Sequence, residues 1–211
     1  ETTVGARLGV VSTRRHRLPT GDPGHRIEGV HTGTQALVCK AMREGPPFSA
    51  AVRAARERGY TEPDPRADLS GEDVARKLLI LAREAGLRVG RDDVAVESLV
   101  PEGLECVPLD AFWERLPEGD AAWAQRLAEH AGRGEELQYV AVLEGGGIRA
   151  GIRALPAESP LAGLRGAANV VAFYTGRYAP EPLVVQGPGA SADITTAVLL
   201  ADIVRAAEAM R

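Results

Sequence analysis

Aromatic residues are scarce in this sequence, and basic residues are not in excess. Three Phe, two Trp and four Tyr in 211 residues are too few for the aromatic platform on which single-stranded nucleic acids stack. The 25 Lys and Arg are outnumbered by 29 Asp and Glu, whereas nucleic-acid binders usually carry a basic stripe. We therefore expect no nucleic-acid partner.

The sequence also lacks long apolar runs and cysteine pairs. No run approaches the ~20 residues that cross a bilayer, and no basic-then-apolar signal peptide is present. Cys39 and Cys106 lie far apart and outside any metal-ligand spacing, which is typical of reduced thiols in a cytosolic protein, with a single disulfide left open. The four scattered histidines do not suit zinc. We expect a cytoplasmic protein with no membrane partner.

The order of apolar segments predicts an α+β fold, a mixed β-sheet covered by helices. Strand candidates alternate with turns in the middle of the chain, at residues 94–99, 104–109, 137–143, 148–155, 169–174 and 183–185. Residues 27–38 are expected to form a strand that enters a turn and then a helix. Helices are expected at residues 49–58, 70–85, 121–131 and 191–210. Ser49 and Ser70 are the expected N-caps of the first two helices.

The most informative stretch is the acidic loop at residues 60–69, Y-T-E-P-D-P-R-A-D-L, with the helix that follows it. Pro63 and Pro65 bias the residues before them toward extended geometry, so we expect a rigid loop with no helix. Asp73 and Lys77 are four apart and share one helical face, and the apolar stripe continues beside them. The spacing leaves open a surface ion pair or a polar-substrate site where carboxylates surround a lysine.

Two glycine turns precede helical segments. Gly33 lies in T-G-T, and Gly189 lies in G-P-G-A before the last helix. Either turn fits a site for a phosphate on backbone N–H groups or a plain turn. No G-x-G-x-x-G, P-loop or G-x-S-x-G occurs.

Residues 60–84, Y-T-E-P-D-P-R-A-D-L-S-G-E-D-V-A-R-K-L-L-I-L-A-R-E, resemble the signature of homoserine dehydrogenases. The likeness is strongest to the dehydrogenase half of bifunctional aspartate kinase–homoserine dehydrogenases. Weaker similarity extends over nearly the whole chain, through E-T-T-V-G-A, R-I-E-G-V, N-V-V-A-F-Y and P-L-V-V-Q-G-P-G-A. The resemblance implies NAD- or NADP-dependent interconversion of L-homoserine and L-aspartate 4-semialdehyde in threonine, methionine and isoleucine biosynthesis.

The resemblance also implies a division of the chain. Residues 1–190 would form the catalytic, substrate-binding and dimerisation domain. Residues 191–211 would form a C-terminal helix that packs on a nucleotide-binding domain, which is missing from this sequence. We therefore expect a piece of a longer protein, a homodimer formed through residues 94–174, and no homoserine oxidation by this chain alone. A non-catalytic dimerisation or amino-acid-sensing module that keeps the fold is the alternative.

Specific roles follow from the resemblance. The catalytic residues would be Lys77, which holds the substrate hydroxyl or carbonyl and helps to move its proton, and Asp73. Glu62 would receive the substrate ammonium. The remaining substrate-binding residues would be Asp68, Tyr60 and Thr34. Gly33 and Gly189 would approach the cofactor. A monovalent cation, expected to be sodium, would lie on the opening turn, held by Glu1 and the carbonyls of Val4, Ala6 and Leu8.

Overall fold

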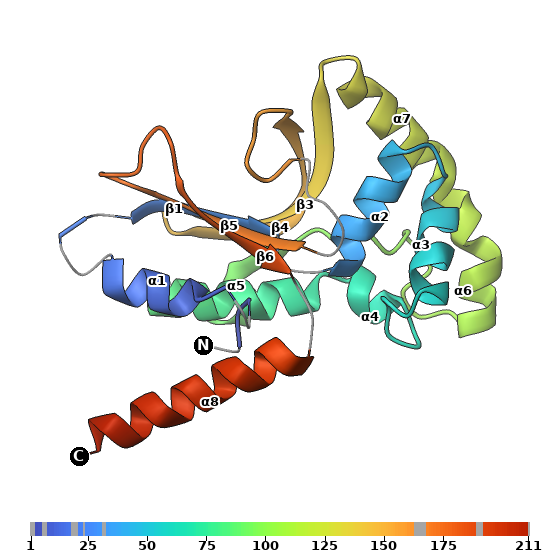
Figure 1. Ribbon diagram of the computed structural model, residues 1–211. Helices are drawn as coiled ribbons and strands as arrows, with labels where there is room; N and C mark the ends of the chain where they lie inside the picture. Colours follow the sequence, from blue (N-terminus) through green and yellow to red (C-terminus); the bar gives the residue numbers. More distant parts are fainter. Residues whose placement is uncertain are drawn as a thin grey trace.

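The structure, a computed structural model, describes residues 3–5, 8–17, 21–22, 24–30, 33–162, 168–188 and 192–210. Its centre is a six-stranded sheet with strand order β2-β4-β3-β1-β5-β6 (Figure 1). The strands are β1 (Gly24–Val30), β2 (Val94–Val96), β3 (Glu135–Glu144), β4 (Gly147–Pro156), β5 (Ala168–Thr175) and β6 (Leu183–Pro188). β2 runs parallel to β4, and all other neighbours are antiparallel. The predicted α+β fold with a mixed sheet is confirmed.

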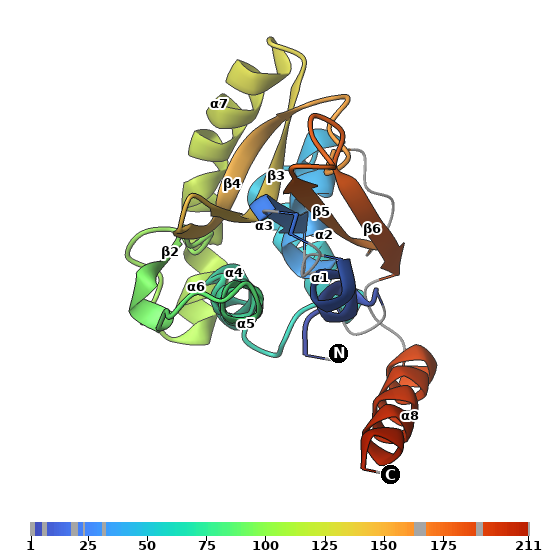
Figure 2. The ribbon, with the colours of Figure 1, turned by 90° about the vertical axis from the view of Figure 1, so that its left-hand side faces the viewer.

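Helices flank the sheet at one face and at one end. They are α1 (Val10–Arg17), α2 (Gly33–Arg43), α3 (Phe48–Glu57), α4 (Arg66–Leu69), α5 (Glu72–Glu84), α6 (Leu109–Arg115), α7 (Asp120–Ala131) and α8 (Ala192–Ala209), with 3₁₀ turns η1 (Arg91–Asp93) and η2 (Leu116–Gly119). Figures 1 and 2 show α1 and α5 side by side along one face of the sheet, while α2, α3, α6 and α7 gather at one end. In both views α8 stands apart from this body.

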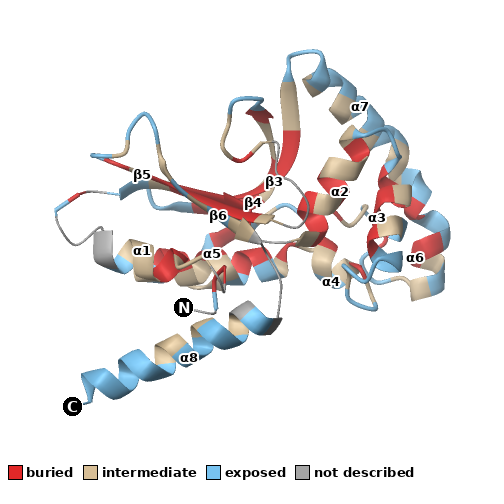
Figure 3. Ribbon diagram, in the orientation of Figure 1, coloured by how far each residue is buried: buried red, intermediate tan, exposed pale blue. Residues whose placement is uncertain are grey.

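The core lies between α5 and the sheet. Val74, Leu78 and Leu81 on α5 are at most 1% exposed, and they belong to one apolar cluster with Leu137 and Ile152 of the sheet. Figure 3 shows this burial along α5 and the central strands, with α8 largely exposed. The stripe predicted from the sequence is therefore the buried face of the helix.

Most predicted elements of the second half of the chain are confirmed. β3 and β4, which correspond to the predicted strands 137–143 and 148–155, form a hairpin with Glu144 opposite Gly147. Gly145 and Gly146 between them have φ of 57° and 81°, a conformation that glycine adopts without steric cost. Cys39 is buried, Cys106 is exposed, and both thiols are free.

Two local predictions about residues 60–69 and 104–109 are wrong. The last part of the acidic loop forms the helix α4, which starts directly after Pro65. The fixed φ of proline suits the start of a helix. Residues 104–109 do not form a strand. Their carbonyl groups accept hydrogen bonds from Arg66 and thus do not pair in a sheet, and α6 begins at Leu109.

The two predicted serine N-caps are also wrong. Ser49 lies inside α3, where its N–H and hydroxyl donate to the Asp120 carboxylate at 2.7 Å each, so a distant residue does the capping. Ser70 follows α4, and Gly71 precedes α5 with φ of 78°. A tertiary contact and a backbone conformation decided both helix starts.

Candidate functional site

The acidic loop and the first turn of α2 are joined through Thr34. The Thr34 side chain is buried, and its hydroxyl donates to the carbonyl oxygen of Tyr60. The same hydroxyl lies 3.2 Å from Oδ1 of Asp68. Next to it, the Gln35 amide donates to the Asp68 carbonyl at 2.7 Å. Three of the predicted substrate-binding residues therefore meet at one place.

The Asp68 carboxylate holds the loop closed. Its Oδ2 accepts the backbone N–H of Glu62 at 2.8 Å, while Oδ1 faces Thr34. A carboxylate offers about four lone-pair positions, so these contacts leave room for a further donor. Glu62 is exposed and Tyr60 is 46% exposed. The loop thus presents carboxylates toward solvent while its backbone is fixed.

Asp73 and Lys77 lie in the first two turns of α5, directly after this loop. Lys77 Nζ donates to Asp73 Oδ2 at 2.6 Å. The Lys77 side chain is only 24% exposed, against 53% for Asp73. The pair is thus an i,i+4 ion pair whose lysine points partly inward. The apolar stripe beside the pair predicted the same for Asp73, which is exposed instead. A single pocket for Glu62 and Lys77 remains a prediction.

Gly71, which the sequence pattern did not single out, seats α5 on the sheet. A Cβ atom here would lie 2.2 Å from the Tyr139 hydroxyl oxygen and 2.7 Å from Cγ1 of Val96. The Tyr139 hydroxyl donates to the Glu97 carbonyl at 2.8 Å, and burial raises the pKa of Tyr139 well above its ordinary value. The start of α5, and with it Asp73, is thereby fixed against the sheet. A glycine in the first turn of the predicted helix 70–85 was the available signal.

The opening turn lies against the end of β6. Val4 is fully buried, and the N–H of Leu8 donates to the Gly5 carbonyl at 2.7 Å. A Cβ at Gly187 would lie 2.7 Å from Cδ2 of Leu8, so turn and strand are in close contact. The other predicted residues of the cation and cofactor sites, Glu1, Ala6 and Gly189, lie outside the described residues, and Gly33 is the first residue of α2.

The described part of the chain offers neither a side-chain metal cluster nor a membrane span. Within the described ranges, no three His, Cys, Asp or Glu side chains are grouped to hold a metal ion. None of the helices in that part of the chain combines the length and the apolar character needed to cross a membrane.

The cavity of about 550 Å³ at the far end of α5 is not the predicted site. Its lining includes Arg14, Arg26, Leu87 and Phe173, and it contains none of the predicted site residues. Glu144 is its single carboxylate among the lining residues. The loop before α5, in contrast, carries Glu62, Asp64 and Asp68.

Comparisons with known sequences agree on one family. The homoserine dehydrogenase family model matches residues 10–204. Bifunctional aspartokinase/homoserine dehydrogenase 2 of Zea mays is 46% identical over 211 residues, which cover 98% of this chain and 23% of that protein. Homoserine dehydrogenase of Emericella nidulans is 43% identical over 223 residues, which cover 99% of this chain and 60% of that protein. The chain thus spans less than two thirds of either relative.

Solved structures share the fold. A Candida auris protein of unknown function matches with a TM-score of 0.94 and 39% identity over 99% of this chain and 60% of that one. A putative homoserine dehydrogenase from Archaeoglobus fulgidus matches with a TM-score of 0.73 and 25% identity, over 95% of this chain and 56% of that one. Since the family model covers most of the sequence and the fold agrees, this chain belongs to the homoserine dehydrogenase family.

Proposed function

We propose that this chain is the catalytic, substrate-binding and dimerisation domain of an NAD- or NADP-dependent homoserine dehydrogenase, which interconverts L-homoserine and L-aspartate 4-semialdehyde. One observation carries the proposal. The Asp68 carboxylate draws Thr34 and the backbone of Glu62 together directly before α5, which bears Asp73 and Lys77. This is a polar, partly desolvated arrangement of the kind that binds small charged substrates.

Substrate binding is assigned to the loop. Glu62 has an exposed side chain on a fixed backbone, which suits reception of the homoserine ammonium in a charge-assisted hydrogen bond. Asp68 and Asp73 would bind the polar end of the substrate, and Tyr60 and Thr34 would line the same pocket. Because Asp68 is already bonded to the protein, its position does not depend on the substrate.

Proton movement is assigned to Lys77. Oxidation of an alcohol by hydride transfer needs a coupled group that takes up the hydroxyl proton. Lys77 would hold the substrate oxygen and help to move that proton. Asp73, bonded to Nζ at 2.6 Å, would fix the direction of the lysine.

The cofactor and the cation are inferred from the family. Bound NAD or NADP supplies the hydride acceptor, and the hyperthermophilic archaeal homoserine dehydrogenase that shares this fold was solved in complex with NADPH. Gly33 and Gly189 would line the nicotinamide side, where the lack of a side chain permits close approach. For sodium, the expected ligands are Glu1 and the carbonyls of Val4, Ala6 and Leu8. These are all oxygen donors, which hard cations prefer.

A nucleotide-binding domain is the partner we propose for α8. The helix exposes Leu199, Leu200, Ile203 and Val204, each between 48% and 60%. The apolar stripe that the sequence predicts on this helix consists of Ile194, Val198, Ala201 and Val204. Val204 is exposed, Val198 and Ala201 are half-buried, and the side chain of Ile194 lies outside the described residues. We propose residues 1–190 as the catalytic domain and 191–211 as the helix that this partner domain covers.

We also propose a homodimer formed through the sheet of residues 94–174. Sedimentation velocity of the chain at tens of micromolar should show a dimer, as expected of a closed two-fold assembly. Observation of monomer alone would contradict it. A cytoplasmic location stays a prediction, since the Zea mays relatives are described as chloroplastic.

Reconstitution tests the proposed function. The 211-residue chain alone should not oxidise homoserine, because the nicotinamide must be held within ~3.5 Å of the substrate carbon and no dinucleotide-binding motif occurs in the sequence. Fusion to the nucleotide-binding domain of a close relative should give homoserine-dependent reduction of NAD or NADP. A folded fusion that binds the cofactor but shows no turnover would refute the proposal. Turnover by the unfused chain would show that no partner domain is needed for the reaction.

A further inference from the structure

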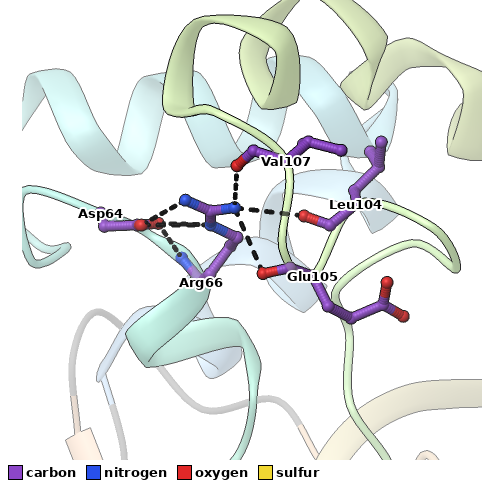
Figure 4. Close-up of polar contacts among 5 residues, drawn as sticks. All are labelled: Asp64, Arg66, Leu104, Glu105 and Val107. Carbon is purple, nitrogen blue, oxygen red and sulfur yellow. Dashed lines mark hydrogen bonds and ion pairs between the residues drawn. The ribbon is translucent and has the colours of Figure 1, made fainter.

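Arg66 joins the acidic loop to a segment almost forty residues later (Figure 4). Its Nε donates to Oδ1 of Asp64 at 2.9 Å, and its Nη2 donates to Oδ2 at 2.6 Å. On the other side, Nη1 points at three backbone carbonyl oxygens, those of Leu104 at 3.3 Å, Glu105 at 3.2 Å and Val107 at 2.6 Å. One guanidinium therefore binds two separate stretches of chain.

The contacts of Arg66 use features that only an arginine has. The planar guanidinium carries five N–H donors in a fixed fork, and here both edges of the fork are occupied. The side chain is 17% exposed, and its Cζ lies 5.4 Å from the centre of the Phe112 ring. The backbone N–H of Arg66 also donates to Asp64 at 3.0 Å. A lysine would keep the charge but lose the fork.

The position of Arg66 connects this clamp to the candidate site. Arg66 is the first residue of α4, which has four residues, too few to be stable without tertiary contacts. Asp68 lies two residues further along the same short helix, and its carboxylate holds the N–H of Glu62 and faces Thr34. The placement of Asp68 therefore depends on the contacts that hold α4.

We propose that Arg66 is a positioning residue for substrate recognition. By fixing α4 to residues 104–107, it holds Asp68 and Glu62 at the spacing that receives the ammonium of an amino-acid substrate. The role of Arg66 in placing the loop stands on the contacts alone, while its effect on substrate rests on the proposed function. Arg66 itself does not touch the reacting atoms in this assignment.

Amide exchange on the 211-residue chain tests the placement without any turnover. In Arg66→Ala, the Glu62 amide should exchange at least about 10-fold faster than in the wild type, because loss of the clamp opens the loop locally. Arg66→Lys should fall between the two. Arg115→Ala is the matched control, since Arg115 makes the same two-bonded pair with Glu118 away from the loop, at 2.9 and 3.0 Å.

Steady-state kinetics in the reconstituted enzyme test the link to substrate. In Arg66→Ala, the KM for homoserine should rise about 10-fold or more, while kcat changes less than about 3-fold and the KM for the cofactor stays constant. A merely structural role would lower kcat through loss of folded enzyme, with no selective change in the homoserine KM. Asp64→Asn, which keeps the carbonyl contacts of Arg66, should give a smaller rise.

The two measurements separate the possible failures. Wild-type exchange at Glu62 in both Arg66 variants would overturn the positioning role, whatever the activity. Faster exchange with an unchanged homoserine KM would overturn the link to substrate. Absence of turnover in the wild-type fusion would overturn the proposed function and leave the exchange result to decide the placement. If Arg66→Ala does not fold, Arg66→Lys decides both questions.

Discussion

The segment 60–84 and the helix α8 differ in how far their side chains are bonded to, and covered by, the rest of the chain. In the segment, Asp68 bonds to the Glu62 N–H and faces Thr34, Arg66 donates to the Val107 carbonyl, and the apolar face of α5 is covered by the sheet. α8 stands away from the body and leaves leucine, isoleucine and valine side chains in solvent (Figures 1 and 3). Residues of this chain cover the apolar side chains of the first region, whereas those of α8 are exposed, which is why we propose a partner domain for that helix.

The largest expected difference is between two identical substitutions. Leu78 on α5 is 1% exposed and Leu200 on α8 is 60% exposed. Leu78→Ala should lower the free energy of unfolding by about 2–5 kcal/mol through lost burial and a cavity. Leu200→Ala should change it by less than about 0.5 kcal/mol. Urea denaturation of both variants measures this, and equal losses would contradict the comparison. In the fusion with a nucleotide-binding domain, the cost of Leu200→Ala should grow.

Alanine substitutions at two glycines with positive φ, Gly71 and Gly59, distinguish the cost of backbone strain from the cost of steric overlap. Gly71→Ala should cost about 3 kcal/mol or more, because overlap with Tyr139 adds to the left-handed backbone. Gly59 has φ of 72°, and no atom of the described residues lies within 4 Å of the position that a Cβ would take there. Gly59→Ala should therefore cost only about 1 kcal/mol. Thermal unfolding followed by circular dichroism compares them. Equal costs would show that α5 is not seated tightly at Gly71.

Substitution of Lys77 tests whether the segment 60–84 takes part in the reaction. In the reconstituted enzyme, Lys77→Ala should reduce turnover by about 10²-fold or more, the scale of a proton-transfer group, while the fold persists. Lys40→Ala removes a lysine from another i,i+4 pair, with Glu44, and serves as the control that should leave turnover unchanged. Wild-type turnover in Lys77→Ala would make the Asp73 pair a surface ion pair and no more.

The smallest expected effect is a pH dependence of the clamp. The Arg66 guanidinium holds the pKa of Asp64 below its ordinary value of 3.8. A carboxyl group whose pKa is lowered on folding stabilises the protein above the unfolded pKa, and this contribution is lost as pH falls through the folded pKa. The unfolding midpoint of the wild type should therefore fall more steeply below about pH 4 than that of Asp64→Asn. Because Asp64 is 43% exposed, solvent screening keeps the difference small, and identical acid profiles would contradict the assignment.

Part of the fold and of the site was predictable from local pattern. The β3–β4 hairpin follows from two apolar runs around adjacent glycines, and the buried face of α5 follows from its period. The side-by-side placement of Asp73 and Lys77 follows from their spacing of four. The helix α4 and the capping of α3 by Asp120 were missed, since each depends on contacts distant in sequence.

The sequence by itself indicated the family, most of the longer helices and strands, and the acidic character of the loop, because periodicity and motif spacing are local properties. Only the tertiary structure decided how the loop is held. Arg66 looked like one charge among several in residues 60–69, and its role depends on the carbonyls of Leu104, Glu105 and Val107. Gly71 likewise matters through Tyr139 on a strand far along the chain. Hydrogen bonds and steric contacts of this kind join residues that only the folded backbone brings within reach.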